Sequence, residues 1–315
     1  MSDKINSSAR PTVLVPYVNT AARKNSRDVF VYLRPETNGV LAESTLLKII
    51  ESSKIYKRSV QLVYLANIPG GYMISHGIVE DHYRHKMPFA RNGHHAFTPH
   101  MRCRFEEHFS TEFDASRIVG AFDALKILGL SREELFEIWV PESAVLEINC
   151  QLIKRIGEIY VVNSNIPALL QKNSHATDIA VMILRTQLST DNLHQMIGEM
   201  IIAMRERGFL ERETPFGRAF HYSRGPFEVL LDARGHLYDA DGEHVPLSEM
   251  QFCSFLQERG ILYEEVSKIL DFPIMLFRGS RGEIVEDCIF DHTSDDSYED
   301  AYKKLKSAVS HHIPR

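Results

Sequence analysis

Histidine and arginine side chains concentrate in one early stretch of the chain, HGIVEDHYRHKMPFARNGHHAFTPHMRCRFEEH, at residues 76–108. These 33 residues hold seven of the 15 histidines of a 315-residue chain, together with five Arg or Lys. Imidazole exchanges protons near neutral pH and is a common metal ligand. Guanidinium groups bind phosphates and carboxylates through charge-assisted hydrogen bonds. The stretch is therefore the first candidate for a functional site.

Anion binding is the chemistry that this stretch favours most. Residues 82–108 contain five Arg or Lys and two Glu, an excess of three positive charges in a chain of net charge −6. His100 lies in the first turn of a helix expected to begin at Pro99, where backbone N–H groups are unsatisfied and the helix dipole is positive. Arg104, and Arg91 from the preceding loop, would complete a phosphate or carboxylate site there. We therefore expect a phosphorylated small molecule or a nucleotide as ligand of a cationic pocket.

A divalent metal is the alternative cofactor. His82 and His85 stand at i, i+3 on one short helix and can converge on one ion, with Asp81, His94 or His95 as further ligands. Neutral imidazole suits zinc, iron or nickel. This interpretation predicts a metal-dependent hydrolase, although the sequence contains no H-E-x-x-H motif.

A structural role is the third interpretation. Arg104 and Glu107 stand at helical pairing distance, so they can neutralise each other without any ligand. The chain would then be a non-catalytic interaction or regulatory protein. Whether it is an enzyme stays open; in a catalytic protein His82, His85 or His100 would transfer the proton.

A second, shorter segment also combines polar side chains. FHYSRGPFE, at residues 220–228, places His221 and Arg224 beside a Gly-Pro pair. This segment could clamp an anion or simply turn the chain.

The elements that must position these groups follow from hydrophobic patterning. DVFVYLR (28–34) and SVQLVYLANI (59–68) are β-branched and aromatic, which predicts strands, and a helical stripe begins near Ser44 between them. Strand, helix, strand at this spacing predicts α/β or α+β layering. A short helix over residues 78–86 should end before Pro88, because proline disrupts a helix interior.

Later segments predict further hairpins and amphipathic helices. The expected elements are a hairpin over 145–163, a strand over 178–185, a helix over 191–207 with a methionine stripe, short strands over 227–247, a hairpin over 274–286 and a helix after Ser297. We therefore predict an α+β fold with a disordered tail at residues 1–10, an N-terminal α/β domain at 11–143 and a C-terminal α+β domain at 144–315.

Residues 27–91 resemble the opening of the nucleoside diphosphate kinase family. RDVFVYLRPETNGV, then a helix, a strand and EDHYRHKMPF, is similar to that family's strand ending in Lys-Pro-Asp and its later Glu-His-Tyr and Pro-Phe motifs. On this match Arg34 stands where the family has a phosphate-contacting lysine. Tyr83 matches its active-site tyrosine, and Phe89 matches the phenylalanine that stacks on the base.

The resemblance covers about 65 of the 315 residues and departs from the family at its catalytic motif. The Asn-x-x-His-Gly-Ser-Asp segment, which carries the phosphorylated histidine, has no counterpart here. Without that histidine a phosphoryl relay has no nucleophile. The resemblance therefore implies a ferredoxin-like, nucleotide-capable first domain rather than that enzyme.

Composition and charge limit the classes of binding partner and the cellular compartment that we expect. A net charge of −6 and a pI of about 6.2 disfavour general nucleic-acid binding. No run approaches membrane-spanning length, and MSDKINSSAR lacks the apolar core of a signal peptide. The four scattered cysteines favour free thiols in a reducing compartment. We therefore expect a cytoplasmic protein with a small anionic ligand and no membrane partner, and leave homo-oligomer formation open.

Overall fold

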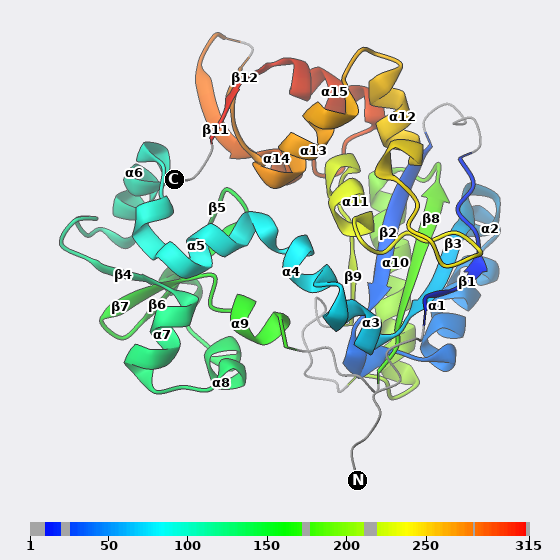
Figure 1. The fold of residues 1–315 in the computed structure, drawn as a ribbon, viewed down its shortest axis with the longest axis horizontal. Helices are drawn as coiled ribbons and strands as arrows, with labels where there is room; N and C mark the ends of the chain where they lie inside the picture. The colour runs from blue at the N-terminus through cyan, green and yellow to red at the C-terminus, as the bar shows by residue number, and fades with distance from the viewer. Residues whose placement is uncertain (1–9, 20–25, 172–176, 211–218, 280, 313–315) are drawn as a thin grey trace. The chain divides into compact units, whose positions relative to one another are not determined.

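The computed structural model describes residues 10–19, 26–171, 177–210, 219–279 and 281–312 and mixes helices with several sheets (Figure 1). This confirms the predicted α+β class. Nearly all of the tail expected at residues 1–10 lies outside the described residues.

The chain divides into two compact units. The first unit comprises Met1–Ile78, Asn173–Tyr263 and Ser294–Ala301, and the second comprises Val79–Lys172, Glu264–Thr293 and Tyr302–Arg315. The boundary expected near residue 143 therefore falls inside the second unit. Hydrophobic patterning locates the elements but does not reveal that residues 79–172 are inserted between two strands of one sheet.

The first unit contains a five-stranded sheet in the order β1-β3-β8-β2-β9, in which every neighbouring pair is antiparallel. Its strands are β1 (Thr12–Val15), β2 (Arg27–Leu33), β3 (Val60–Ile68), β8 (Ile179–Thr186) and β9 (Phe220–Tyr222). Along the chain, β2, helix α1 (Val40–Ser52), β3, β8, helix α10 (Thr190–Glu206) and β9 follow the β-α-β-β-α-β order of ferredoxin-like folds. The second half of this unit lies beyond residue 172.

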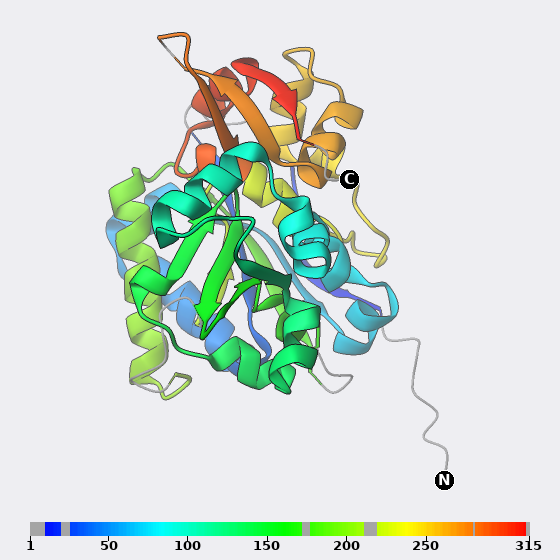
Figure 2. The same ribbon diagram turned by 90° about the vertical axis from the view of Figure 1, so that its left-hand side faces the viewer.

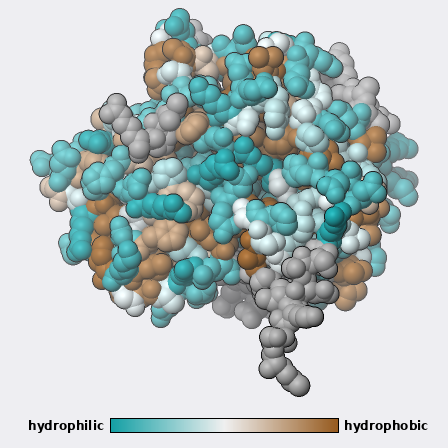
Figure 3. All heavy atoms as spheres, viewed as in Figure 1, coloured by the Kyte–Doolittle hydropathy of each residue, from teal (hydrophilic) through white to brown (hydrophobic). Residues whose placement is uncertain are grey.

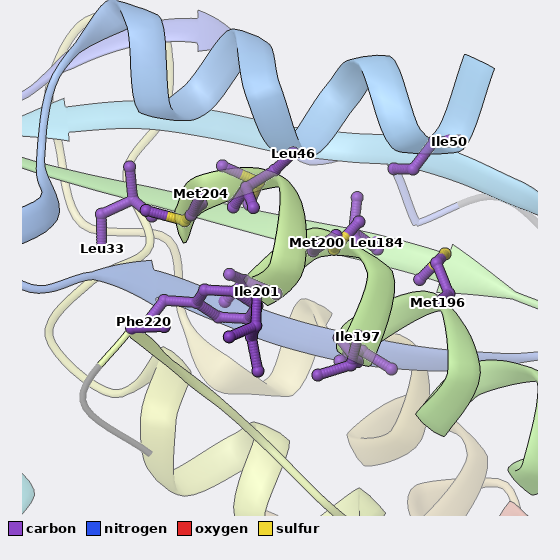
Figure 4. Packing of buried hydrophobic residues seen from close by; sticks show 14 of the residues in the cluster. Leu33, Leu46, Ile50, Leu184, Met196, Ile197, Met200, Ile201, Met204 and Phe220 are labelled. Atoms are coloured by element: carbon purple, nitrogen blue, oxygen red, sulfur yellow. The ribbon is translucent and has the colours of Figure 1, made fainter. Parts of the chain in front are cut away.

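Helices α1 and α10 cover one face of this sheet (Figure 4). On α10, Met196, Met200 and Met204 recur once per turn and are fully buried. They pack against inward-facing strand residues such as Val31 and Leu184. Each such side chain contributes about 1.5–3 kcal/mol by leaving water, so the methionine stripe is core packing.

The opposite face of the sheet packs against helix α11 (Pro226–Ala233), with α12 (Gln251–Gln257) beside it. The prediction of short strands from residue 227 is wrong for α11. Its Val229, Leu230 and Leu231 are all buried, and a run that is buried on every side has no period to separate helix from strand. Near Gly242 the expected turn is present, with Tyr238 bridged to His244.

The remaining helices of the first unit are α2 (Lys54–Ser59) and α3 (Gly70–Ser75). The second unit has the helices α5 (Met87–Asn92), α6 (Pro99–Phe109), α7 (Ala121–Leu128), α8 (Arg132–Glu137), α9 (Ile166–Leu169) and α14 (Ile289–His292). Helices α4 (Ile78–His82), α13 (Tyr263–Asp271) and α15 (Tyr298–Lys306) lie at the points where the chain passes between the units.

Two sheets belong to the second unit. The first, drawn in green in Figure 2, has the order β4-β7-β6-β5 and one parallel pair, β4 with β7. The second is antiparallel, in the order β11-β10-β12. Their strands are β4 (Arg117–Gly120), β5 (Val145–Ile148), β6 (Gln151–Ile156), β7 (Ile159–Val162), β10 (Ile274–Arg278), β11 (Ile284–Cys288) and β12 (Ala308–His311).

Helix α6 shows how local sequence directs the packing of this unit. The Thr98 hydroxyl accepts a hydrogen bond from the Met101 N–H at 3.0 Å, and Pro99 occupies the first turn, as the sequence predicts. Met101 and Phe105 are fully buried, and the Phe105 ring meets Tyr160 of β7 at 4.7 Å. The polar face of α6 is left exposed.

A disulfide joins Cys150 to Cys288 within the second unit across 138 residues of sequence. The expectation of four free thiols is therefore wrong, because the turn between β5 and β6 and the end of β11 bring together two cysteines that are scattered in the sequence. Cys103 is exposed and free, and Cys253 is buried and free. The cysteine pattern consequently gives no support to a reducing compartment.

None of the described helices is both long and apolar enough to cross a membrane. On the face of the molecule shown in Figure 3, hydrophilic residues surround smaller hydrophobic patches.

Candidate functional site

A cavity of about 180 Å³ lies in the second unit. Most of its wall is apolar, with polar atoms contributed by two histidines, an arginine and an aspartate. Its lining residues are Arg84, His85, Pro88, Phe89, Asp271, Phe272, Pro273, Ile274 and His312.

Three separate segments of the chain build this cavity. Instead of one helix ending before Pro88, the chain forms α4, a 3-10 turn over Arg84–Lys86, and then α5 with Pro88 in its first turn. His85 and Phe89 come from this first segment. The second segment joins the end of α13 to β10. The third follows β12, where the His312 N–H donates to the Ile274 carbonyl at 2.8 Å.

His85 is the most buried polar side chain of the cavity, with 7% of its surface exposed. Its ring meets Phe290 edge to face at 5.4 Å and hydrogen-bonds the backbone of His82. Burial, and then the charge of Lys86, lower the pKa of His85 to about 3, against the effect of the hydrogen bond to His82. The imidazole is therefore neutral at pH 7.

The tautomer of His85 decides what its free nitrogen can do. Nδ1 is buried and has no hydrogen-bond partner among the described residues, and the ring makes a hydrogen bond to the His82 backbone that raises its pKa. In the neutral tautomer that carries its hydrogen on Nε2, Nδ1 presents an unused lone pair.

His312 supplies a second unsatisfied ring nitrogen. Its Nε2 is buried and lacks a partner within the described part of the chain. Arg84, by contrast, forms ion pairs with Asp81 and with Asp271, the latter at 3.7 Å. The positive charge near the cavity is thus matched by carboxylates.

Of the residues predicted to bind an anion, only Phe89 lines this cavity. Phe89 lines the cavity and is buried, whereas Tyr83 packs in a different hydrophobic cluster of the second unit. Arg91 and His100 are exposed, and Arg104 pairs with Glu107 at 3.2 Å. Arg34 belongs to the first unit. The cavity therefore gives no support to a cationic pocket built by these residues, and that pocket stays a prediction.

The histidines proposed as metal ligands are likewise engaged elsewhere. The His82 ring contacts Tyr83 at 4.6 Å, and the rings of His94 and His95 lie 3.9 Å apart. His94 Nδ1 lies 2.9 Å from the carbonyl oxygen of Ile118. Among the described residues, neither group of three side chains spaced to hold an ion includes any of these histidines or His85.

No family model, curated protein or solved structure matches this chain. The resemblance to the nucleoside diphosphate kinase family thus stays a prediction.

One of the two groups spaced to hold an ion lies in the first unit and consists of His221, Glu228 and Asp232. His221 stands on β9, directly opposite Tyr32 of β2, and Glu228 and Asp232 lie one turn apart on α11. His221 Nε2 is 2.7 Å from an Asp232 carboxylate oxygen. The other group consists of Cys150, Cys288 and Asp291, and its two cysteines are joined in the disulfide.

The charges of this cluster influence one another. Burial opposes the charged form of His221, but Asp232 and Glu228 outweigh burial and the repulsion of Arg34, so the pKa of His221 is raised. Burial, and then the charge of Asp232, raise the pKa of Glu228, although His221 and Arg224 act in the opposite direction. Arg34 and His221, both singled out in the sequence, therefore interact here.

Sequence reasoning noticed His221 but missed its two carboxylate partners. The available signal was Gly225-Pro226, since a proline at the first helical position favours a helix start. A helix from Pro226 places Glu228 and Asp232 at i, i+4 on one face. The prediction of strands for this segment did not indicate that Glu228 and Asp232 lie on one face of a helix.

Proposed function

We propose that the second unit binds a small, uncharged ring compound that donates a hydrogen bond to His85. The observation that carries this proposal is the buried Nδ1 of His85, which lacks a partner among the described residues and borders the cavity. A buried acceptor left without a donor costs about 1–3 kcal/mol. A ligand N–H or O–H that reaches Nδ1 offsets that cost.

The size and lining of the cavity support a ring. An apolar cavity of about 150 Å³ is large enough for benzene, and this one measures about 180 Å³. Phe89 and Phe272 offer flat surfaces, and Pro88, Pro273 and Ile274 offer aliphatic contacts. His312 Nε2 provides a second polar contact, as donor or acceptor according to its tautomer.

The same features weigh against the phosphorylated ligand expected from the sequence. A phosphate group has no hydrogen to give Nδ1 when it is fully ionised, and a neutral imidazole does not attract its charge. Arg84 is already paired with Asp81 and Asp271. We therefore propose an uncharged donor such as a phenol-like or indole-like ring.

A pair of probe ligands tests this function. Phenol and toluene match in shape, but only phenol carries an O–H. We expect the full chain to bind phenol roughly five-fold more tightly than toluene, because a net hydrogen bond contributes about 1 kcal/mol. His85→Phe keeps an aromatic ring and removes the acceptor, so it should abolish the preference.

His100→Phe is the matched control, because His100 is an exposed histidine of the same unit that does not line the cavity. It should keep the preference for phenol. Weak and equal binding of both ligands to the unsubstituted protein, or an unchanged preference in His85→Phe, would refute the proposal.

A further inference from the structure

We infer that His221, Glu228 and Asp232 of the first unit form a binding site for a divalent cation of the Mn²⁺ or Zn²⁺ type. The ligand atoms of the three side chains all lie within 4.8 Å of one another. They come from two adjacent elements, β9 and α11. One imidazole nitrogen and two carboxylates are a donor set that these ions accept.

The site is held in place by the sheet. Phe220 faces the core that α10 covers, so the alternation of a strand directs His221 to the other face, toward α11. The Tyr32 ring lies 5.6 Å from the His221 ring, and His236 Nδ1 contacts the Asp232 carbonyl oxygen at 2.8 Å. Both sides of the cluster are thereby fixed before any ion binds.

The cluster must contract to hold an ion. Two atoms bound to one ion at about 2.1 Å lie about 3.0–3.4 Å apart when the angle at the ion is octahedral or tetrahedral. A pair of the three ligand atoms at the 4.8 Å limit therefore has to close by about 1.4–1.8 Å. The ion would take the place of the hydrogen between His221 Nε2 and Asp232, which leaves as a proton to solvent.

The three ligand side chains differ in solvent exposure. The Asp232 side chain is 1% exposed, whereas those of His221 and Glu228 are 24% and 15% exposed. The buried carboxylate would anchor the ion, and the two partly exposed ligands give it a route from solvent. Water would complete the coordination on that side.

Two cationic groups face the cluster and oppose an added positive charge. The Arg224 guanidinium lies 3.7 Å from Glu228 and is 49% exposed, so it is able to turn outward. Arg34 acts on His221 from beyond the end of β2. Against them stand the buried carboxylate of Asp232 and the partly exposed carboxylate of Glu228, one helical turn apart, whose mutual repulsion a cation between them relieves.

Mn²⁺ is the probe of choice because it prefers oxygen and imidazole ligands over the exposed thiol of Cys103. Free Mn²⁺ is counted by electron paramagnetic resonance during titration of the full chain without a histidine tag. We expect one saturable site. Glu228→Gln and His221→Gln should each weaken binding at least ten-fold.

His194→Gln is the matched control. His194 also contacts a carboxylate, Asp295 at 3.0 Å, but it belongs to neither described group of three ligands. It should bind Mn²⁺ like the unsubstituted protein, and Mn²⁺ should raise the melting temperature of both. Unsaturable binding, or equal affinity in Glu228→Gln, would leave only a structural ion pair. If His221→Gln does not fold, Glu228→Gln decides, because it keeps the shape of a partly exposed side chain.

Discussion

His85 and His312, from opposite ends of the second unit's sequence, line one cavity, and each keeps a buried ring nitrogen without a partner in the described part of the chain. Buried polar atoms are nearly always hydrogen-bonded in folded proteins. These two exceptions beside the same apolar cavity are the observation on which we base the proposed ligand.

The burial of His85 predicts a stability that falls in mild acid. An imidazole in the unfolded chain titrates near 6.5, whereas the pKa of folded His85 is about 3. Between these values the unfolded chain binds a proton that the folded chain does not, so the free energy of unfolding decreases as pH falls below 6.5. The loss between pH 7.5 and pH 5 should be about 2 kcal/mol.

Denaturant unfolding at both pH values measures this loss, and His85→Phe isolates it from other groups. The variant should lose about 2 kcal/mol less than the unsubstituted protein over the same interval. An identical acid dependence in both proteins would mean that His85 is not held neutral.

The disulfide predicts a large dependence on reductant. Cys150 and Cys288 close a loop of 138 residues, and the chain-entropy model gives about 5 kcal/mol as an upper value for such a loop. Replacing both by serine should lower the free energy of unfolding by about 2–5 kcal/mol. Cys103→Ser, at an exposed free thiol, should leave it unchanged. Equal stability with and without reductant would contradict the pairing.

The ion pair of Asp28 and Arg185 predicts that substitution of Asp28 strongly destabilises the protein. They face each other across β2 and β8, and the guanidinium binds both carboxylate oxygens at 2.8 and 3.0 Å, almost wholly buried. Asp28→Ala leaves a buried cation and should cost about 3–5 kcal/mol in thermal or denaturant unfolding.

The exposed pair of Lys126 and Asp123 provides the comparison. Asp123→Ala should change the free energy of unfolding by less than about 1 kcal/mol, because exposed ion pairs contribute little. Similar losses for Asp28→Ala and Asp123→Ala would show that the Asp28–Arg185 pair is not buried in solution.

The sequence predicted those elements whose signals are local. Thr98-Pro99 marks the start of α6, and the methionine stripe marks α10, because caps and one-sided burial depend only on neighbouring residues. Helix α11 was not predicted, because its apolar run is buried on all sides and shows no helical period. The cysteine pair was not predicted because its members, 138 residues apart, meet only through tertiary packing of two separate sheets.

The candidate sites likewise combine residues that local sequence singled out with residues that only tertiary packing brings in. His85 and Phe89 were both singled out, and one helical turn brings both to the cavity. His312 and Asp271 reach it only through tertiary packing. The histidine-rich stretch was expected to act as one surface, but it forms several short helical segments, which change at Met87 and Gly93.

A crystal structure of the protein soaked with phenol tests the central claim most directly. We predict a ring in the cavity between Phe89 and Phe272, with its hydroxyl oxygen at about 2.6–3.0 Å from His85 Nδ1. A cavity that excludes phenol, or a ring whose hydroxyl points away from His85, would contradict the account.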